Sequence, residues 1–214
     1  MESAVAIDVV LERSSFSRLV FALDERLRRR LSVFDYVDHP DCILRMQIGQ
    51  ADEEAALADD LRLRAGDRLI DLHLWNEHLP EMGRDGPSVG WARKLSKLLD
   101  FSLRELAVYL AARPQLDDIA VIRAIMPLRG LEQSRHVHFI ATRYGFHAAP
   151  EAAPHSLGRL LHRAGENALG LMLVLASNPA AARLDILMRS RAALYLARRD
   201  LDARYRDNIS SLRR

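Results

Sequence analysis

Cysteine and lysine are nearly absent from this chain of 214 residues. Its one cysteine, Cys42, can form neither an intramolecular disulfide nor a thiolate zinc cage, which excludes the disulfide-rich secreted class. Lysine occurs only as Lys94 and Lys97, so arginine supplies the other 29 of the 31 basic residues. A GC-rich genome explains this bias more simply than bidentate recognition does, so the arginine count is not evidence of phosphate binding.

Export, membrane and nucleotide signals are also missing. No apolar run approaches the ~18 residues of a transmembrane helix, and the acidic Asp8 and Glu12 stand where an export signal would be apolar. We therefore expect a cytoplasmic protein. The formal net charge of +2 predicts no nucleic-acid partner. A Walker-type loop, a Gly-x-Gly-x-x-Gly fingerprint and a Gly-x-Ser-x-Gly elbow do not occur, so we expect no cofactor.

Hydrophobic spacing predicts helices and strands in alternation. The expected helices are Ser17 to Leu31, Trp91 to Leu99, Leu103 to Ala112, Leu131 to Tyr144, Leu157 to Leu175 and a last one from about Asp200. The expected strands are Cys42 to Ile48, Arg68 to Trp75, Ile119 to Met126, Phe146 to Ala148 and a run from Arg191. A capping box of Ser102 and Glu105 divides the two middle helices. The acidic stretch from Asp52 to Asp60 is expected to be a solvated connection with a helical turn.

This order of elements predicts an α/β or α+β fold, with a mixed β-sheet covered by helices in a single compact domain. The hydrophobic content of 49% is enough for a substantial core. Residues 1–40 are expected to form an N-terminal helical segment and residues 41–214 the α/β domain, as one globular unit.

The first two expected strands place polar side chains together. If the strands pair with their apolar faces on the core, one polar face carries Arg45, Gln47, Asp71, His73 and Trp75, and Arg123 is the candidate to join it. A tryptophan among hydrogen-bonding groups can stack on a sugar or a base. The alternative is an ordinary solvent face on which Arg45 pairs with Asp71. In this register Leu72 and Leu74 are buried, and Trp75 is partly accessible beside Arg45 and Asp71.

The run from His73 to His78 concentrates reactive groups where the strand passes into a loop. Glu77 or His78 could act as a general base, flanked by the amide of Asn76. A metal site would need a bend at Asn76 or Glu77, and a third ligand from His136 or His138. The alternative is scattered histidines, and we expect no bound metal.

The long helix becomes apolar nearly all round between Leu169 and Ala176. Such a helix end is usually buried in a core. The alternative is that it docks onto a membrane-associated partner or the bilayer surface, with the neighbouring Arg183, Arg189 and Arg191 meeting anionic headgroups.

Four short motifs occur in an order that resembles the YkoP-like domain family over about Asp41 to Tyr205. They are Gly66-Asp67, Leu72 to Glu77, Ser102 to Ala107 and Tyr144-Gly145-Phe146. Some members of that family are joined to polysaccharide deacetylases or lie near glycosyltransferases. The resemblance therefore implies a link to envelope polysaccharide or glycolipid metabolism. It transfers no catalytic residues.

Two functions are compatible with these observations. The first is a cytoplasmic accessory or ligand-binding domain for a glycan or glycolipid, with the binding residues Arg45, Asp71, His73, Trp75, Asn76 and Arg123. The second is a small hydrolase or transferase that uses Glu77 or His78 as a general base, with a histidine-bound metal as one variant.

Overall fold

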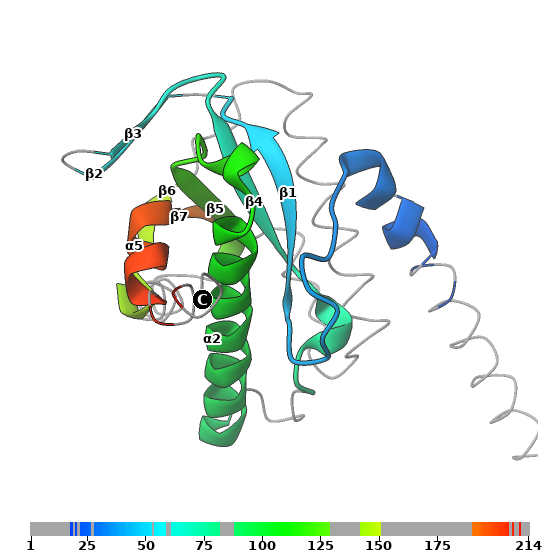
Figure 1. Ribbon diagram of the computed structural model, residues 1–214. Helices are drawn as coiled ribbons and strands as arrows, with labels where there is room; N and C mark the ends of the chain where they lie inside the picture. The colour runs from blue at the N-terminus through cyan, green and yellow to red at the C-terminus, as the bar shows by residue number, and fades with distance from the viewer. Residues whose placement is uncertain are drawn as a thin grey trace, which may run out of the picture.

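The structure is a computed structural model (Figure 1), and it describes residues 18, 20, 22–26, 28–52, 54–58, 61–81, 88–128, 142–150, 190–205, 207 and 210. The strands are β1 (Leu44–Gln50), β2 (Ala55–Ala58), β3 (Leu61–Leu63), β4 (Arg68–Leu74), β5 (Val121–Leu128), β6 (His147–Pro150) and β7 (Ser190–Ala197). The helices include α2 (Val89–Ala111), α5 (Arg198–Arg204) and the short 3-10 helices η1 (Asn76–His78) and η2 (Pro114–Leu116).

Five strands form a mixed sheet in the order β1-β4-β5-β7-β6, and β2 pairs with β3 separately. The β4–β5 pair is parallel and the other neighbours in the sheet are antiparallel. The mixed sheet, with helices packed on it, confirms the predicted fold class. The short strand expected near Phe146 is the edge strand β6, and the strand expected from Arg191 is β7, which leads directly into α5.

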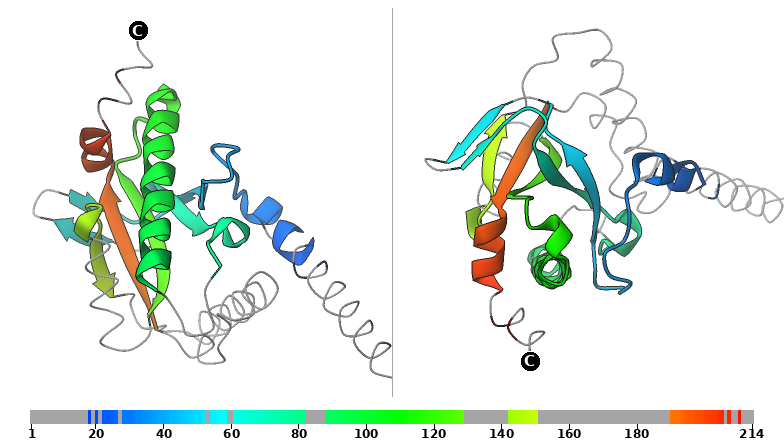
Figure 2. Two further views of the ribbon diagram at one scale, coloured as in Figure 1. Left: turned by 90° about the horizontal axis from the view of Figure 1, so that it is seen from below. Right: turned by 45° about the horizontal axis from the view of Figure 1, so that its top comes forward.

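The main core lies between the sheet and α2, which crosses one face of the sheet beside α5 (Figure 2). Every third or fourth residue of α2 is apolar, which gives the helix one apolar stripe. The fully buried side chains of this interface are Leu103, Leu106 and Leu110 on α2, and Met46, Ile70 and Ile122 on the strands. The odd-numbered residues of β1, β4 and β5 therefore point to the opposite face.

The prediction of two helices separated at Ser102 is wrong, because α2 is continuous from Val89 to Ala111. Ser102 lies inside the helix and is fully buried. Its hydroxyl donates to Leu98 O at 2.7 Å and accepts the backbone N–H of Ile43 at 2.9 Å. A serine that bonds the carbonyl four residues earlier does not need to cap a helix. The helix does end before Pro114, as expected.

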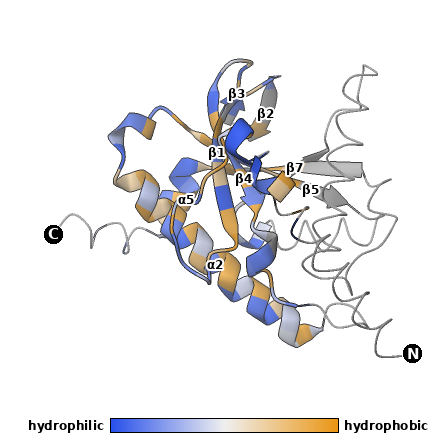
Figure 3. Ribbon diagram, turned by 90° about the vertical axis from the view of Figure 1, so that its right-hand side faces the viewer, coloured by the Kyte–Doolittle hydropathy of each residue, from blue (hydrophilic) through white to orange (hydrophobic). Residues whose placement is uncertain are grey.

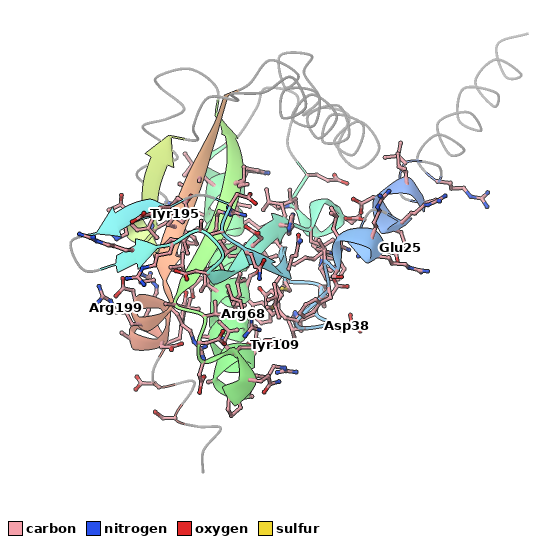
Figure 4. The ribbon with its side chains drawn as sticks, turned by 90° about the horizontal axis from the view of Figure 1, so that it is seen from above. Glu25, Asp38, Arg68, Tyr109, Tyr195 and Arg199 are labelled. Atoms are coloured by element: carbon pink, nitrogen blue, oxygen red, sulfur yellow. The ribbon has the colours of Figure 1, made fainter. Side chains whose placement is uncertain are left out.

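The expected helical turn in the acidic stretch is wrong, because residues 55–58 form strand β2, which pairs antiparallel with β3 directly after the stretch as the β2–β3 hairpin. This hairpin lies over one end of the sheet face that α2 leaves open, where Leu57 and the buried Leu63 pack against Leu69, Val121 and Tyr195. Tyr195 is drawn beside the hairpin in Figure 4. The acidic residues concealed this strand signal, which depends on contacts with residues distant in the sequence.

The burial of a side chain on β4 depends on which element packs over it and not only on the alternation of side chains between the two faces. Leu72 is buried as predicted, but the predicted burial of Leu74 is wrong, since it is 43% exposed at the end of the strand. Ile48, near one end of β1, is also exposed. Leu69 points away from α2 and is nevertheless fully buried, because the hairpin covers it.

Several other predictions are settled by the described residues. Those between 18 and 31 are helical, which confirms the first helix. Gly145 has φ +84°, the left-handed conformation that is typical of the residue after a helix end. The expected helix over 157–175 and most of the one over 131–144 lie outside the described residues. Among the described helices, none is both long enough and apolar enough to cross a bilayer.

Replacing Ser102 with alanine is expected to destabilise the fold by about 1–3 kcal/mol, because it leaves the N–H of Ile43 buried without an acceptor. The measurement is the free energy of unfolding in urea. Ser96→Ala is the matched control in the same helix. Tyr144 keeps its bond to the Ser96 carbonyl in that variant, so it should cost less than about 1 kcal/mol. Equal losses for the two variants would contradict the role of Ser102.

Candidate functional site

Four polar side chains form a row across three neighbouring strands, on the sheet face opposite α2. The register sets Gln47 opposite Asp71, and Asp71 opposite Arg123. His73 Nε2 donates to Gln47 Oε1 at 3.2 Å, and Arg123 binds Asp71 with two bonds of 2.6 and 2.9 Å. We call Gln47, His73, Asp71 and Arg123 the polar row. Because each member is held by its neighbour on a rigid strand, the row is preorganised.

The Asp71–Arg123 pair is mostly buried, with side-chain exposures of 15% and 17%. Burial by itself lowers the pKa of Arg123, but the hydrogen bonds and charge of Asp71 outweigh it and raise that pKa above its usual value. A two-bond pair of this kind fixes the planes of both groups as well as their charges.

Gly49 makes room for this pair. A Cβ atom built on Gly49 would lie 2.9 Å from Asp71 Oδ2, closer than carbon and oxygen can approach without movement. The glycine in β1 is therefore required by the carboxylate on the neighbouring strand and not by a turn.

A second group, the Arg45 cluster, consists of Arg45, Asp24, Asp35, Glu77, Trp75 and His78. Arg45 is only 5% exposed. Its Nε donates to Asp35 Oδ1 at 2.8 Å, and its Nη1 lies 3.8 Å from Asp24 Oδ2 and 3.9 Å from Glu77 Oε2. One guanidinium thus joins the N-terminal helix, the loop before β1 and the 3-10 helix η1. Such a buried cation requires paired acids.

The aromatic part of the Arg45 cluster is a stack. The Arg45 guanidinium carbon lies 4.0 Å from the centre of the Trp75 ring, and the His78 ring stacks on Trp75 at 3.7 Å and 16°. The predicted contact of a partly accessible Trp75 with Arg45 is confirmed. Because two protein groups already lie against the indole, less of its surface is left to stack on a ligand.

The position of His78 results from a bend in the chain. Trp75 N still bonds Ile43 O at 2.8 Å, and η1 then turns the chain so that His78 N bonds Trp75 O at 3.0 Å. His78 Nδ1 donates to the Cys42 carbonyl at 2.7 Å. In the neutral ring this bond leaves Nε2 as the basic nitrogen. Glu77, beside it in sequence, is directed to Arg45.

The pKa of the Asp24 carboxyl, in the Arg45 cluster, is raised above its usual value. Burial raises this pKa, and although Arg28 opposes the rise, the charge of Glu77 adds to it. Two carboxylates near one guanidinium repel each other, so the cluster favours a proton, a cation or a hydroxyl donor over an added anion.

The expected alternative pair of Arg45 with Asp71 is wrong. The register sets Arg45 opposite His73, and each charge has another partner, Asp35 for Arg45 and Arg123 for Asp71. The choice between partners depends on β5 and on the loop before β1, neither of which can be located by examining the two strands alone.

The predicted site residues therefore fall into two groups that share β1 and β4. Asp71, His73 and Arg123 belong to the polar row, and Arg45, Trp75, Glu77 and His78 belong to the Arg45 cluster. Asn76 begins η1, and its side chain is outside the description. Sequence reasoning missed Asp24, Asp35 and the role of Gly49. Because the expected strand ends at Ile48, before Gly49, the sequence pattern carries no signal for any of the three.

No three side chains of histidine, cysteine, aspartate or glutamate within the described ranges are placed to hold a metal ion. His136 and His138, the candidates for a third ligand, lie outside those ranges, as do residues 169–176 of the expected docking helix.

Comparison with known families identifies the chain. The model of the YkoP domain matches residues 15–168, more than half of the chain, so this protein belongs to the YkoP domain family. The match includes every residue of both groups and ends before β7, the strand that lies between β5 and β6. No curated protein matches the chain, and no solved structure does.

Substitution Gly49→Ala is expected to destabilise the fold by about 1–3 kcal/mol, since the new methyl group displaces a buried, paired carboxylate. The same substitution in an Asp71→Ala background should be neutral or stabilising by up to about 1 kcal/mol, as replacing glycine in a strand normally is. Urea unfolding of the four proteins measures this difference. Equal costs in both backgrounds would show that Gly49 serves something other than Asp71.

Proposed function

We propose that this protein is an accessory, ligand-binding domain of envelope polysaccharide or glycolipid metabolism that works in the cytoplasm. Its ligand is a glycan or the glycan part of a glycolipid, bound on the polar row. Membership of the YkoP domain family supports the metabolic setting, and the geometry of the row supports the ligand class.

One observation carries the choice of ligand: an amide, an imidazole, a carboxylate and a guanidinium stand side by side in fixed register on three strands. Sugars present neighbouring hydroxyl groups, each of which donates and accepts hydrogen bonds. Planar hydrogen-bond donors and acceptors that are already oriented by pairing with one another suit such a ligand. The Arg45 cluster borders the row through the Arg45–His73 pair of β1 and β4, and its excess of carboxylates supplies further acceptors.

Gln47→Ala is expected to weaken glycan binding by about tenfold, because it removes one ligand contact and the acceptor that orients His73. Binding is measured by calorimetry with a panel of envelope oligosaccharides and glycolipid headgroups. Gln50→Ala is the matched control, since Gln50 is on the same strand and points to the opposite face. Unchanged affinity in Gln47→Ala, or no binding of any glycan, would contradict the proposal.

A hydrolase or transferase is the second candidate, and one observation favours it. The bond from His78 Nδ1 to the Cys42 carbonyl fixes the tautomer in which Nε2 can accept a proton. Glu77 lies next to it in η1, and its carboxylate contacts Arg45. In a variant of this second candidate, histidine side chains, among them His73, bind a metal ion.

If the domain is an enzyme, His78→Gln and Glu77→Gln should each reduce turnover of a bound glycan by about 10²-fold or more, with glycan affinity unchanged. Product formation is followed by chromatography. Elemental analysis of protein prepared without chelator tests the metal variant of this hypothesis. The wild type should then contain near-stoichiometric metal, and the metal content should be lower in His73→Ala. Wild-type turnover in both glutamine variants would leave the binding function as the remaining candidate.

A further inference from the structure

The first half of α2 carries an unusual set of cations. Arg93, Lys94 and Lys97 are all exposed, and none of their side chains has a hydrogen bond or ion pair with any residue the structure describes. No acidic residue occurs in α2 before Asp100. Pairing with an acid on the same part of the helix therefore does not explain their presence.

This set continues onto the segment packed beside α2. Tyr144 OH donates to the Ser96 carbonyl at 2.8 Å, which sets the exposed Arg143 beside the helix. Arg204 of α5 donates to the Arg143 carbonyl at 2.9 Å and lies 5.0 Å from the Tyr144 ring. We call the five residues Arg93, Lys94, Lys97, Arg143 and Arg204 the basic surface. Its nearest acid on α2, Asp100, already accepts the hydroxyl of Tyr205.

The shape of the basic surface indicates what kind of anion it meets. Three of its members lie on the exposed side of α2, Arg204 lies on α5 and Arg143 on the segment beside them, and the first turns of α2 extend past the strands (Figure 1). Polar and apolar residues alternate along the helix (Figure 3), and Val89 at its first position is 70% exposed. Tyr144, which lies against Arg204 of the basic surface, is buried and cannot stack on a nucleic-acid base.

We propose that the basic surface docks this protein on an anionic lipid membrane, with Val89 directed to the headgroup region. Long basic side chains around an exposed apolar residue are the arrangement that binds acidic lipid surfaces without crossing them. The complementary charge is that of the phospholipid headgroups. This inference does not rest on the glycan site, because no residue of the polar row or the Arg45 cluster belongs to the basic surface.

Docking in this way has a consequence for the candidate site. Trp91 Nε1 donates to the Pro80 carbonyl at 3.0 Å, so the start of α2 lies beside the segment that follows η1. A membrane under the first turns of α2 therefore lies on the side of the protein where Glu77 and His78 are found.

The test is co-sedimentation of the full chain with vesicles of phosphatidylcholine and phosphatidylglycerol in equal parts, and with phosphatidylcholine alone. We expect binding to the mixed vesicles only, with loss of binding when salt shortens the Debye length from about 10 Å to about 3 Å. The variant R93E/K97E should bind at least about 30-fold more weakly, because each cation near an anionic surface contributes roughly fivefold.

The control variant is R26E/R30E, which makes the same change in charge at two exposed residues, also four apart, on the N-terminal helix. It should bind the mixed vesicles like the wild type. Equal binding by R93E/K97E and wild type, or equal loss in the two variants, would overturn the proposal. So would a wild type that ignores the mixed vesicles but binds duplex DNA through the same two residues, since the surface would then serve nucleic acid.

Discussion

The register between β1 and β4 is the constraint on which the rest of the site depends. It runs from the pair Leu44–Leu74 to the pair Gln50–Arg68, and backbone bonds at Ile43 and Ala51 extend it at both ends. A slip of one residue would turn every side chain of β1 to the other face and direct Arg45 and Gln47 toward the core. The hydroxyl of Ser102 strengthens this register, because it binds the N–H of Ile43 and so ties α2 to the start of β1.

The two faces of the sheet are held by different interactions. The face under α2 is closed by apolar packing, which needs no specific partners. The other face buries charge, and each buried charge there has a partner: Arg123 has Asp71, and Arg45 has Asp35 together with two further acids. Pairs of this kind add little net stability, because desolvation offsets much of the attraction. Their cost is a reason to look for a function on this face.

The three surfaces considered for function use different chemistry. The polar row offers oriented donors and acceptors, the Arg45 cluster offers excess carboxylate and an imidazole with a fixed tautomer, and the basic surface offers positive charge that no described acid pairs with. Trp75 packs inside the Arg45 cluster instead of forming an open platform for a ligand, since Arg45 and His78 both lie against its ring. An accessory domain that holds a glycan near a lipid surface would use all three, and membership of the YkoP domain family is compatible with that setting.

The sequence by itself predicted β1, β4, β5, β6 and β7 and, on the assumption that β1 pairs with β4, the face shared by Arg45, Asp71 and His73, because alternation with period two is a local property. Tertiary structure decided the rest. Whether Leu74 is buried depends on how far α2 reaches, and whether the acidic stretch forms strands depends on Leu63 meeting Leu69 and Val121. Which acid pairs with Arg45 depends on Asp24 and Asp35, which lie 21 and 10 residues before it in the sequence. Local patterns carry no information about such contacts, since they form only when distant segments meet.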